Sequence, residues 1–196
     1  MLIAITDKTE RLASYLPSFR SRPLSYSASA AFPERCTRVR IPMTRRVDDL
    51  RDIALGFFFD YDIFPRSILN ACGEWQLAGR AMRTGDVIVQ QASVPPGGTS
   101  LKLIFAVRVL SVESSATEAS FSYGTLSGHA EMGISIFRII LEGDDVIAEI
   151  HTRSRPAQLA GRLVAPLIVN PYQQYCTNRA LAHIRDAVLR STRASD

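Results

Sequence analysis

The sequence predicts an α+β fold in which a curved antiparallel sheet of about seven strands is covered by a long C-terminal helix. From residue 75 to residue 153, apolar and polar positions alternate with a period of two, which is typical of strands. The breaks between these segments are short and rich in turn-forming residues, so they leave room for hairpins and not for crossover helices. After Pro171 apolar residues recur every four positions, which indicates an amphipathic helix.

Composition and charge are those of an ordinary globular chain. Its 196 residues are 46% hydrophobic and 21% charged, which supplies enough apolar material for one well-filled core and argues against disorder. We find no internal repeat and no linker, so we predict a single domain over residues 1–196. The net charge of +4 is too small to indicate a nucleic-acid partner.

The cysteines and the missing motifs argue against a metal or a cofactor. Cys36, Cys72 and Cys176 are far apart, and none lies in a cluster with metal-ligand spacing. Glycine-rich nucleotide motifs and the nucleophile-elbow motif are missing as well, so we expect no metal and no cofactor. An odd number of cysteines disfavours a disulfide framework and suits a reducing cytosol.

The N-terminus and the most apolar segments predict a cytoplasmic protein without a membrane span. Residues 1–16 lack the basic start and the long apolar run of a signal peptide. Segments 101–110 and 163–169 fall well short of the roughly 20 apolar residues that a spanning helix needs.

The N-terminal region, residues 1–35, is predicted to hold one helix and an irregular arm. A capping-box pattern and the apolar spacing place the helix at 7–16. Pro17 is expected to stop it, because proline cannot donate a backbone hydrogen bond. The segment 18–34 is polar and rich in serine and proline, so we expect it to lie on the surface without regular structure.

The central region, residues 36–153, is predicted to form the sheet, with a helix inserted after its first strand. Residues 36–41 alternate in character and form that strand. Apolar residues at helical spacing predict a helix over 47–61, and a short second helix is expected through Ile68 and Leu69. Six further strands are expected at 75–81, 87–94, 101–112, 117–126, 133–141 and 146–153.

The C-terminal region, residues 154–193, is predicted to be the helix that covers the sheet. The segment Ser154–Pro156 is a favourable start, because proline is tolerated in the first turn of a helix. Pro166 and Pro171 are expected to kink or break the helix, since each removes a backbone donor. The outer face of the helix carries Arg179, Arg185, Arg190 and Arg193.

The order of these elements is similar to the helix-grip layout of START-like domains, in which a curved antiparallel sheet wraps the last helix. A sheet bent around a helix often leaves an apolar cavity with a few polar groups. The layout therefore implies a cavity between the sheet and the C-terminal helix.

One run of residues carries a family resemblance. The run FSYGTLSGHAEMG at 121–133, followed by Phe137, resembles the hallmark of DUF1990, a family of unknown function. Arg108-Val109, Ser154–Pro156 and Leu24–Tyr26 match further positions of the family pattern. The similarity covers nearly the whole chain and is strongest in its second half.

The chain departs from the family pattern at one place. Where the family usually has two acidic residues after the glycine, this chain has Ile134 and Ser135. Acid–base chemistry that depends on those carboxylates is therefore not expected here. The resemblance implies a fold and brings no established activity with it.

Four residues in and around the hallmark are candidates for a polar cluster at the mouth of the cavity. His129 titrates near neutral pH, and Glu131 is close enough in sequence to orient its ring. Tyr123 and Thr125 are two residues apart on one strand face and would add a phenol and a hydroxyl. The alternative is a structural hairpin in which His129 and Thr125 bond the amides of the turn.

Arginines form the second candidate set. Arg108, Arg153 and Arg155 would hold a carboxylate or a phosphate in bidentate fashion if they point inward. In the alternative they cap helix carbonyls, pair with acidic side chains or face water. The predicted ligand-binding residues are Tyr123, Thr125, His129, Arg108 and Arg155.

Three functions are consistent with these features. The leading one is binding of a small apolar or amphipathic ligand in the cavity between the sheet and the C-terminal helix. The second is an enzyme that uses His129, with Glu131 orienting it and Tyr123 as a donor. The third is a protein-interaction module without pocket chemistry, which uses either the basic helix face around Arg185 and Arg190 or a dimer surface. No nucleic-acid partner is expected, and the sequence indicates neither a substrate nor an oligomeric state.

Overall fold

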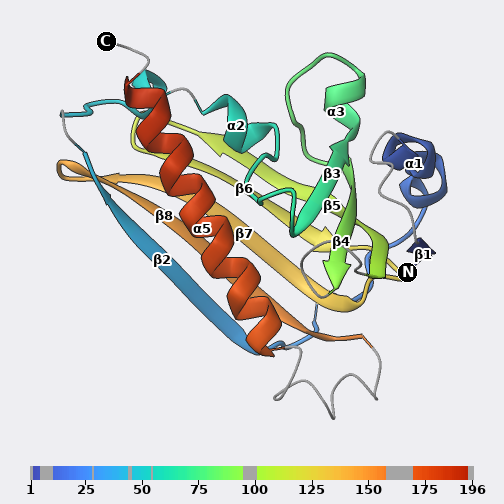
Figure 1. Ribbon diagram of the computed structural model, residues 1–196. Coiled ribbons are helices and arrows are strands. Elements are labelled where there is room, and N and C mark those ends of the chain that lie inside the picture. Colours follow the sequence, from blue (N-terminus) through green and yellow to red (C-terminus); the bar gives the residue numbers. More distant parts are fainter. Residues whose placement is uncertain are drawn as a thin grey trace.

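The structure is built on one antiparallel sheet with helices on both of its faces (Figure 1). The computed structural model describes residues 2–4, 11–27, 29–43, 46–53, 55–94, 101–157 and 170–193. Its strands are β1 (Leu2–Ala4), β2 (Glu34–Pro42), β3 (Leu69–Gly73), β4 (Val87–Val94), β5 (Leu101–Ser114), β6 (Glu118–Thr125), β7 (Glu131–Glu142) and β8 (Asp145–Pro156). The main path of the sheet has the order β2-β8-β7-β6-β5-β4-β3, and β1 pairs with β5.

The helices form separate layers on the two faces. They are α1 (Leu12–Arg20), the 3₁₀ helix η2 (Leu50–Asp52), α2 (Gly56–Phe59), α3 (Glu74–Leu77) and α5 (Asn170–Arg193). α5 lies diagonally across the concave face, whereas α1 packs on the other face beside β4 (Figure 1). Because successive strand residues point to opposite faces, Ile88 belongs to the core under α5 while Val87 and Val89 contact α1.

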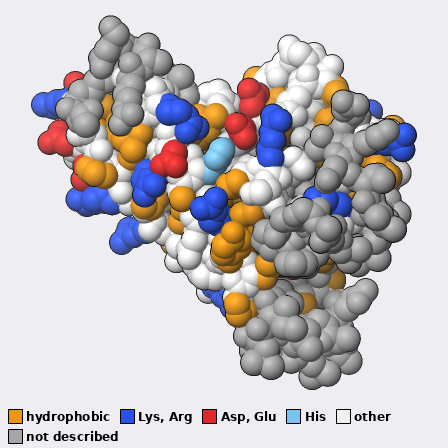
Figure 2. Space-filling view, in the orientation of Figure 1, with side chains coloured by type: hydrophobic (Ala, Val, Ile, Leu, Met, Phe, Trp, Pro, Cys, Tyr) orange, Lys and Arg blue, Asp and Glu red, His pale blue; other side chains and the backbone are white. Residues whose placement is uncertain are grey.

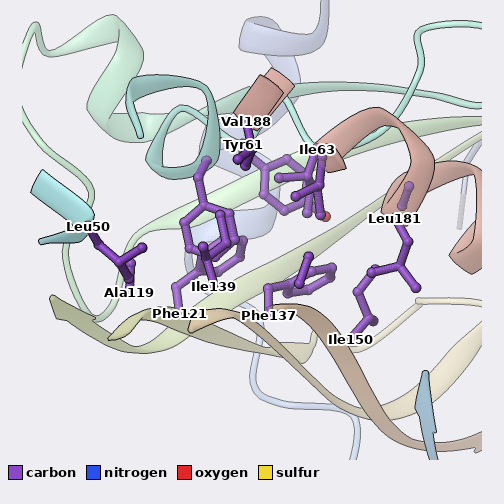
Figure 3. Packing of buried hydrophobic residues seen from close by; sticks show 14 of the residues in the cluster. Leu50, Tyr61, Ile63, Ala119, Phe121, Phe137, Ile139, Ile150, Leu181 and Val188 are labelled. Atoms are coloured by element: carbon purple, nitrogen blue, oxygen red, sulfur yellow. The ribbon is translucent and has the colours of Figure 1, made fainter. Parts of the chain in front are cut away.

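The core under α5 contains a layer of aromatic rings. Phe121 on β6 and Phe137 on β7 stack with ring centroids 5.0 Å apart, and the ring of Tyr61 lies against both. Leu181 and Val188 of α5 close over this layer (Figure 3). Burial of apolar surface stabilises the folded state by about 25 cal/mol per Å². These contacts therefore fix the C-terminal half of α5 on the sheet.

The predicted fold class is confirmed. Consecutive strands from β4 to β8 pair as antiparallel neighbours, and a long helix follows them. β4 has the predicted bounds, β5 has the predicted start, and the remaining ends of β2, β5, β6, β7 and β8 differ from prediction by one to three residues. Among the described helices none is long and apolar enough to cross a membrane.

The strand predicted at 75–81 is wrong, and so is the short helix predicted through Ile68 and Leu69. The last strand of the main path is β3, which begins at Leu69, and α3 follows it directly. The side chain of Gln76 accepts a hydrogen bond from the backbone N–H of Gly73 at 2.8 Å and so caps the start of α3. This local hydrogen bond outweighs the alternating pattern of the sequence.

The helix predicted over 47–61 is also wrong. Its described residues contain only η2 and α2, because Asp49 and Ile53 have extended backbones that interrupt a helical path. The apolar side chains at helical spacing are nevertheless buried, as Leu50 and Phe58 illustrate. An irregular segment thus brings the same side chains to the core that a continuous helix would bring.

The predicted start of the C-terminal helix at Ser154–Pro156 is wrong. These residues end β8, where they pair with Glu131–Gly133 of β7. The described helix begins at Asn170, and Pro171 lies in its first turn, where its missing N–H has no intrahelical partner to lose. Within the described residues, Pro171 therefore lies in the first turn of the helix and interrupts no described part of it. Pro166 lies outside the described residues.

The N-terminal helix also differs from the prediction. The predicted capping pattern lies at residues 7–10, outside the described part of the chain. Pro17 lies inside α1 and does not end it. Leu12, Leu16 and Phe19 are buried against the sheet, and this burial outweighs the one backbone hydrogen bond that proline removes.

Candidate functional site

A pocket of about 330 Å³ lies between the concave face of the sheet and the N-terminal half of α5. We call it the sheet–helix pocket. Strands β2 to β8 contribute side chains to its wall, and α5 contributes Tyr172, Gln173, Gln174, Cys176 and Thr177. The pocket is therefore formed by segments that are distant in sequence and that only the folded sheet brings together.

One side of the pocket is apolar. Phe137 and Ile150 project from β7 and β8, and Phe105 projects from β5. Phe64 and Ile68 add further apolar surface from the segment before β3. An apolar lining of this kind favours the nonpolar part of a ligand, because the ligand leaves water on binding.

A row of polar side chains crosses the sheet at the same pocket. Tyr123 of β6 pairs with Ser135 of β7. Ser135 in turn pairs with Thr152 of β8, which pairs with Arg35 of β2. Directly paired residues lie about 5 Å apart and point to the same face of a sheet, so these four side chains form one line. We call them the polar row, and the hydroxyl oxygens of Ser135 and Thr152 lie 3.4 Å apart.

Buried hydrogen bonds hold one end of the polar row. Gln90 Nε2 donates to the hydroxyl of Tyr61 at 2.5 Å, and further side-chain hydrogen bonds join Tyr123 to Tyr61 and Ser135. Tyr61 has a positive φ of 63°, which costs a residue other than glycine on the order of 1 kcal/mol and must be offset by the packing around it. Burial raises the pKa of both phenols, so both stay protonated at neutral pH.

Glu131 adds a carboxyl group to the pocket wall. Ser154 Oγ of β8 donates to Oε2 at 3.1 Å, and Gln173 Nε2 of α5 donates to Oε1. Burial raises the pKa of this carboxyl, whereas the two hydrogen bonds and the charge of Arg35 act in the opposite direction. The side chain of Glu131 therefore connects β7 to β8 and to α5.

His129 also lies in the pocket wall, but its contacts are not those of a catalytic base. Its Nδ1 accepts the backbone N–H of Glu131 at 2.9 Å, and its ring meets Phe105 edge-on with centroids 4.2 Å apart. Desolvation lowers the pKa of the imidazole to about 3, so the ring is neutral at pH 7. The Glu131 carboxylate bonds to Ser154 and Gln173 instead, so the expected orientation of the ring by that carboxylate is not present.

Two of the predicted ligand-binding residues do not line the pocket. Thr125 is buried, and its hydroxyl bonds Ser25 Oγ at 2.6 Å and accepts the backbone N–H of Gly133 at 2.9 Å. Arg108 donates to the carbonyl oxygen of Arg20 at 2.7 Å, at the last residue of α1. Both side chains are used to hold the N-terminal arm and helix against the sheet.

The other two candidate arginines lie near the end of β8. Arg155 borders the sheet–helix pocket, and its guanidinium carbon lies 5.4 Å from the centroid of the Phe32 ring. Arg153 lines a separate hollow of about 300 Å³ beside Tyr26 of the N-terminal arm. Of the catalytic and ligand-binding candidates from the sequence, the structure brings together at the pocket Tyr123, His129, Glu131 and Arg155.

The pocket wall also contains polar residues that are not site candidates from the sequence, among them Arg35, Gln90, Ser135 and Thr152. Polar residues also occur elsewhere in the same strands, as Arg38 in β2 and Gln91 in β4 illustrate, so no local motif marks these four. One signal was available, because Ser135 and Thr152 each lie two residues from a buried apolar residue of the same strand face. A polar residue at such a position points to the interior.

Comparison with known proteins identifies the family. The family model described as "Domain of unknown function (DUF1990)" matches residues 58–183, which is more than half of the chain. The chain therefore belongs to DUF1990, as the hallmark predicts. No curated protein sequence matches it.

Several solved structures have the same helix-grip fold. A hypothetical protein from Helicobacter pylori aligns with a TM-score of 0.56 and 8% identity, over 85% of this chain and 92% of that chain. The major latex-like protein 151 of Panax ginseng aligns with a TM-score of 0.54 and 8% identity, over 82% and 99% of the two chains. A protein of Thermus thermophilus gives a TM-score of 0.52 at 10% identity, again over 82% and 99%. At such low identities these likenesses show the fold alone.

Proposed function

We propose that this DUF1990 protein binds a small amphipathic ligand in the sheet–helix pocket. The observation that carries the proposal is the division of the pocket wall into an apolar side around Phe137 and Ile150 and the polar row beside it. Pockets for small molecules are typically apolar with a few convergent polar groups, and their volumes run from about 300 to 1,000 Å³. The volume here, about 330 Å³, is at the lower end of that range.

The volume limits the size of the ligand. A water molecule takes up about 30 Å³ in the liquid. A pocket of about 330 Å³ therefore holds roughly ten non-hydrogen atoms at a similar density. This is the size of a short-chain or single-ring compound, and a longer molecule would extend out of the pocket.

Catalysis through His129 is the weaker explanation of the same pocket. A general base works best when its pKa is near the working pH, and desolvation lowers the pKa of His129 to about 3. Its Nδ1 is already occupied by the backbone N–H of Glu131. The contacts of His129 are better explained by the closing of the turn between β6 and β7.

The basic face of α5 offers little support for an interaction module. Arg185 donates to Asp186 on the same helix at 3.0 Å, which offsets part of its charge. The face of the molecule that carries α5 displays basic, acidic and hydrophobic side chains interspersed (Figure 2). A mixed surface of this kind is the usual state of a solvated helix face.

Native mass spectrometry of freshly purified protein, together with thermal shift against small apolar and amphipathic compounds, tests the proposal. A ligand that binds the folded state raises the melting temperature by mass action. Thr152→Phe fills the pocket from β8, and Ser135→Leu fills it from β7. Neither variant should therefore show a rise in melting temperature when ligand is added. Thr117→Phe places a similar ring on an exposed turn and serves as the control that keeps the shift.

The expected result is a ligand mass or a melting-temperature rise of several degrees in the wild type and in Thr117→Phe only. Two results would contradict the proposal. One is that no compound binds the wild type. The other is that both pocket-filling variants, shown to be folded by circular dichroism, bind as tightly as the wild type.

A further inference from the structure

We infer that the ligand of the sheet–helix pocket carries an anionic head group, a carboxylate or a phosphate, that lies on the polar row beside Arg35. Its apolar body then packs against Phe137 and Ile150. The inference rests on the proposed function and narrows it from an amphipathic ligand to an amphipathic anion.

The register of the sheet places a head-group site next to a site for the apolar body. Phe137 pairs with Ile150, and both lie two residues along their strands from Ser135 and Thr152. Two residues of a strand span roughly 7 Å. One apolar row and one polar row therefore lie side by side on the pocket floor, at the distance that separates the head of a small amphiphile from the first part of its body.

The chemistry of the polar row favours an anion over a cation. Ser135, Thr152 and Tyr123 present hydroxyl groups, which can each donate a hydrogen bond. Arg35, at the β2 end of the row, has only donors and keeps its positive charge. A guanidinium together with hydroxyl donors is a typical arrangement for binding a carboxylate or a phosphate.

The charge of Arg35 is available to a ligand. Arginines on the outer face of the sheet are paired: Arg138 donates to Glu118 at 2.8 Å, and Arg40 donates to Asp145 at 3.0 Å. Within the described residues Arg35 forms no such salt bridge, and its electrostatic contact is a longer-range attraction to Glu131. An anion on the polar row would supply the missing partner.

Among the described residues Glu131 is the one carboxyl group in the wall of this pocket, and it does not compete strongly for Arg35. Its two oxygens already accept hydrogen bonds from Ser154 and Gln173, on the α5 side of the pocket. Burial also raises the pKa of Glu131, which favours its neutral form. A cationic ligand would therefore find a poorer site at Glu131 than an anionic ligand finds at the polar row.

Isothermal titration calorimetry with four probes that share an eight-carbon chain tests the inference: octanoate, octyl phosphate, octan-1-ol and octylammonium, each below its critical micelle concentration. We expect octanoate or octyl phosphate to bind the wild type at least about tenfold more tightly than octan-1-ol, because hydrogen bonds to charged groups are stronger than neutral ones. The tighter of the two anions identifies the head group. Octylammonium is expected to bind most weakly.

Arg35→Gln should remove most of this preference and leave the affinity for octan-1-ol within about twofold, since the apolar contacts are unchanged. Arg38→Gln is the matched control, because Arg38 lies three residues along β2 and therefore on the opposite face of the sheet. Thr152→Val, which keeps the side-chain volume and removes the hydroxyl, should weaken anion binding by a smaller factor. Both arginines are exposed, so the two Gln variants should fold normally.

Octan-1-ol that binds the wild type as tightly as both anions would overturn the inference and leave the proposed function standing. An anion preference that survives in Arg35→Gln would overturn the assignment to this arginine. If none of the four probes binds and no ligand co-purifies, the proposed function fails together with the inference.

Discussion

The two halves of α5 lie on the same sheet, yet they enclose two different kinds of interior. In the C-terminal half Leu181, Ile184 and Val188 are at most 4% exposed and pack on the aromatic layer of the sheet. In the N-terminal half Tyr172 and Cys176 occupy corresponding positions on the helix, and they border the sheet–helix pocket. The inward-facing residues have the same spacing in both halves of α5. Spacing therefore does not decide whether the helix packs tightly on the sheet or leaves a pocket.

The chemistry of the inward-facing residues explains the difference. Beneath the C-terminal half, the sheet presents Ala119, Phe121 and Ile139, which a helix can cover without leaving a polar group unpaired. Beneath the N-terminal half it presents the polar row, and an apolar surface packed against this row would offer Arg35, Ser135 and Thr152 no further hydrogen-bond partners. One end of α5 therefore stabilises the fold, and the other end is available for binding.

The largest expected effect is on the closed end. Phe121→Ala removes a fully buried ring that contacts Phe137, Phe58 and Tyr61, and should destabilise the protein by about 3–5 kcal/mol. Phe64→Ala removes a half-buried ring at the pocket and should cost less than about 2 kcal/mol. Urea denaturation of both variants measures the difference. Equal losses would show that the pocket end is packed as tightly as the closed end.

The second prediction concerns the buried carboxyl at the pocket. Burial raises the pKa of Glu131 above its ordinary value of 4.5, so the charged form destabilises the folded state as pH rises through the folded-state pKa. Glu131→Gln should therefore be more stable than the wild type at pH 7.5, by roughly 1 kcal/mol, and the two should become equal below pH 4.5. Urea denaturation across this pH range measures it. A difference that does not change with pH would contradict this explanation.

The third prediction concerns His129. The unfolded chain protonates this histidine near pH 6.5, whereas the folded chain resists protonation down to about 3. The contribution of neutral His129 to the free energy of unfolding is therefore largest above pH 6.5, and it decreases as the pH falls below that value. The wild type should lose about 1 kcal/mol more than His129→Asn between pH 6.5 and pH 5, because part of the ring remains in contact with solvent. Urea denaturation at several pH values measures the difference. If the free energy of unfolding changes with pH equally in the two proteins, the imidazole is not desolvated in the folded state.

The smallest expected effect on stability is in the polar row itself. Thr152→Val removes a hydroxyl whose contact with Ser135 is long, 3.4 Å, so the free energy of unfolding should change by less than about 0.5 kcal/mol. A Thr→Val change at a residue with only a packing role would leave octanoate binding unchanged, whereas Thr152→Val should weaken it. Thermal unfolding with and without octanoate separates the two effects, and a loss of several kcal/mol without ligand would assign Thr152 to the closed core.

The sheet could be predicted from the sequence because the pattern that indicates a long strand lies within the residues of that strand. The alternation of apolar residues with serines in β6 lies in consecutive residues, and short turns between strands fix an antiparallel arrangement. The region from Val47 to Ala81 could not be predicted in this way. There the helical spacing of Leu50 and Phe58 is satisfied by irregular chain, and Gln76 caps a short helix where alternation indicates a strand.

The candidate site was predicted in part, for a related reason. The hallmark motif led to Tyr123, His129 and Glu131, which do line the pocket. The polar row depends on the register of four strands, and no single segment contains that information. Thr125 and Arg108 were candidates on chemical grounds, but the N-terminal arm and α1 supply their hydrogen-bond partners.

A ¹⁵N–¹H NMR titration with octanoate, and separately with octan-1-ol, tests most directly whether the open end of α5 is a binding site. We predict that the largest chemical-shift changes lie at Ser135, Thr152 and Cys176, with little change at Ile184 and Val188. Changes concentrated at Ile184 and Val188, or no saturable change with either compound, would contradict a binding site at this end of the helix.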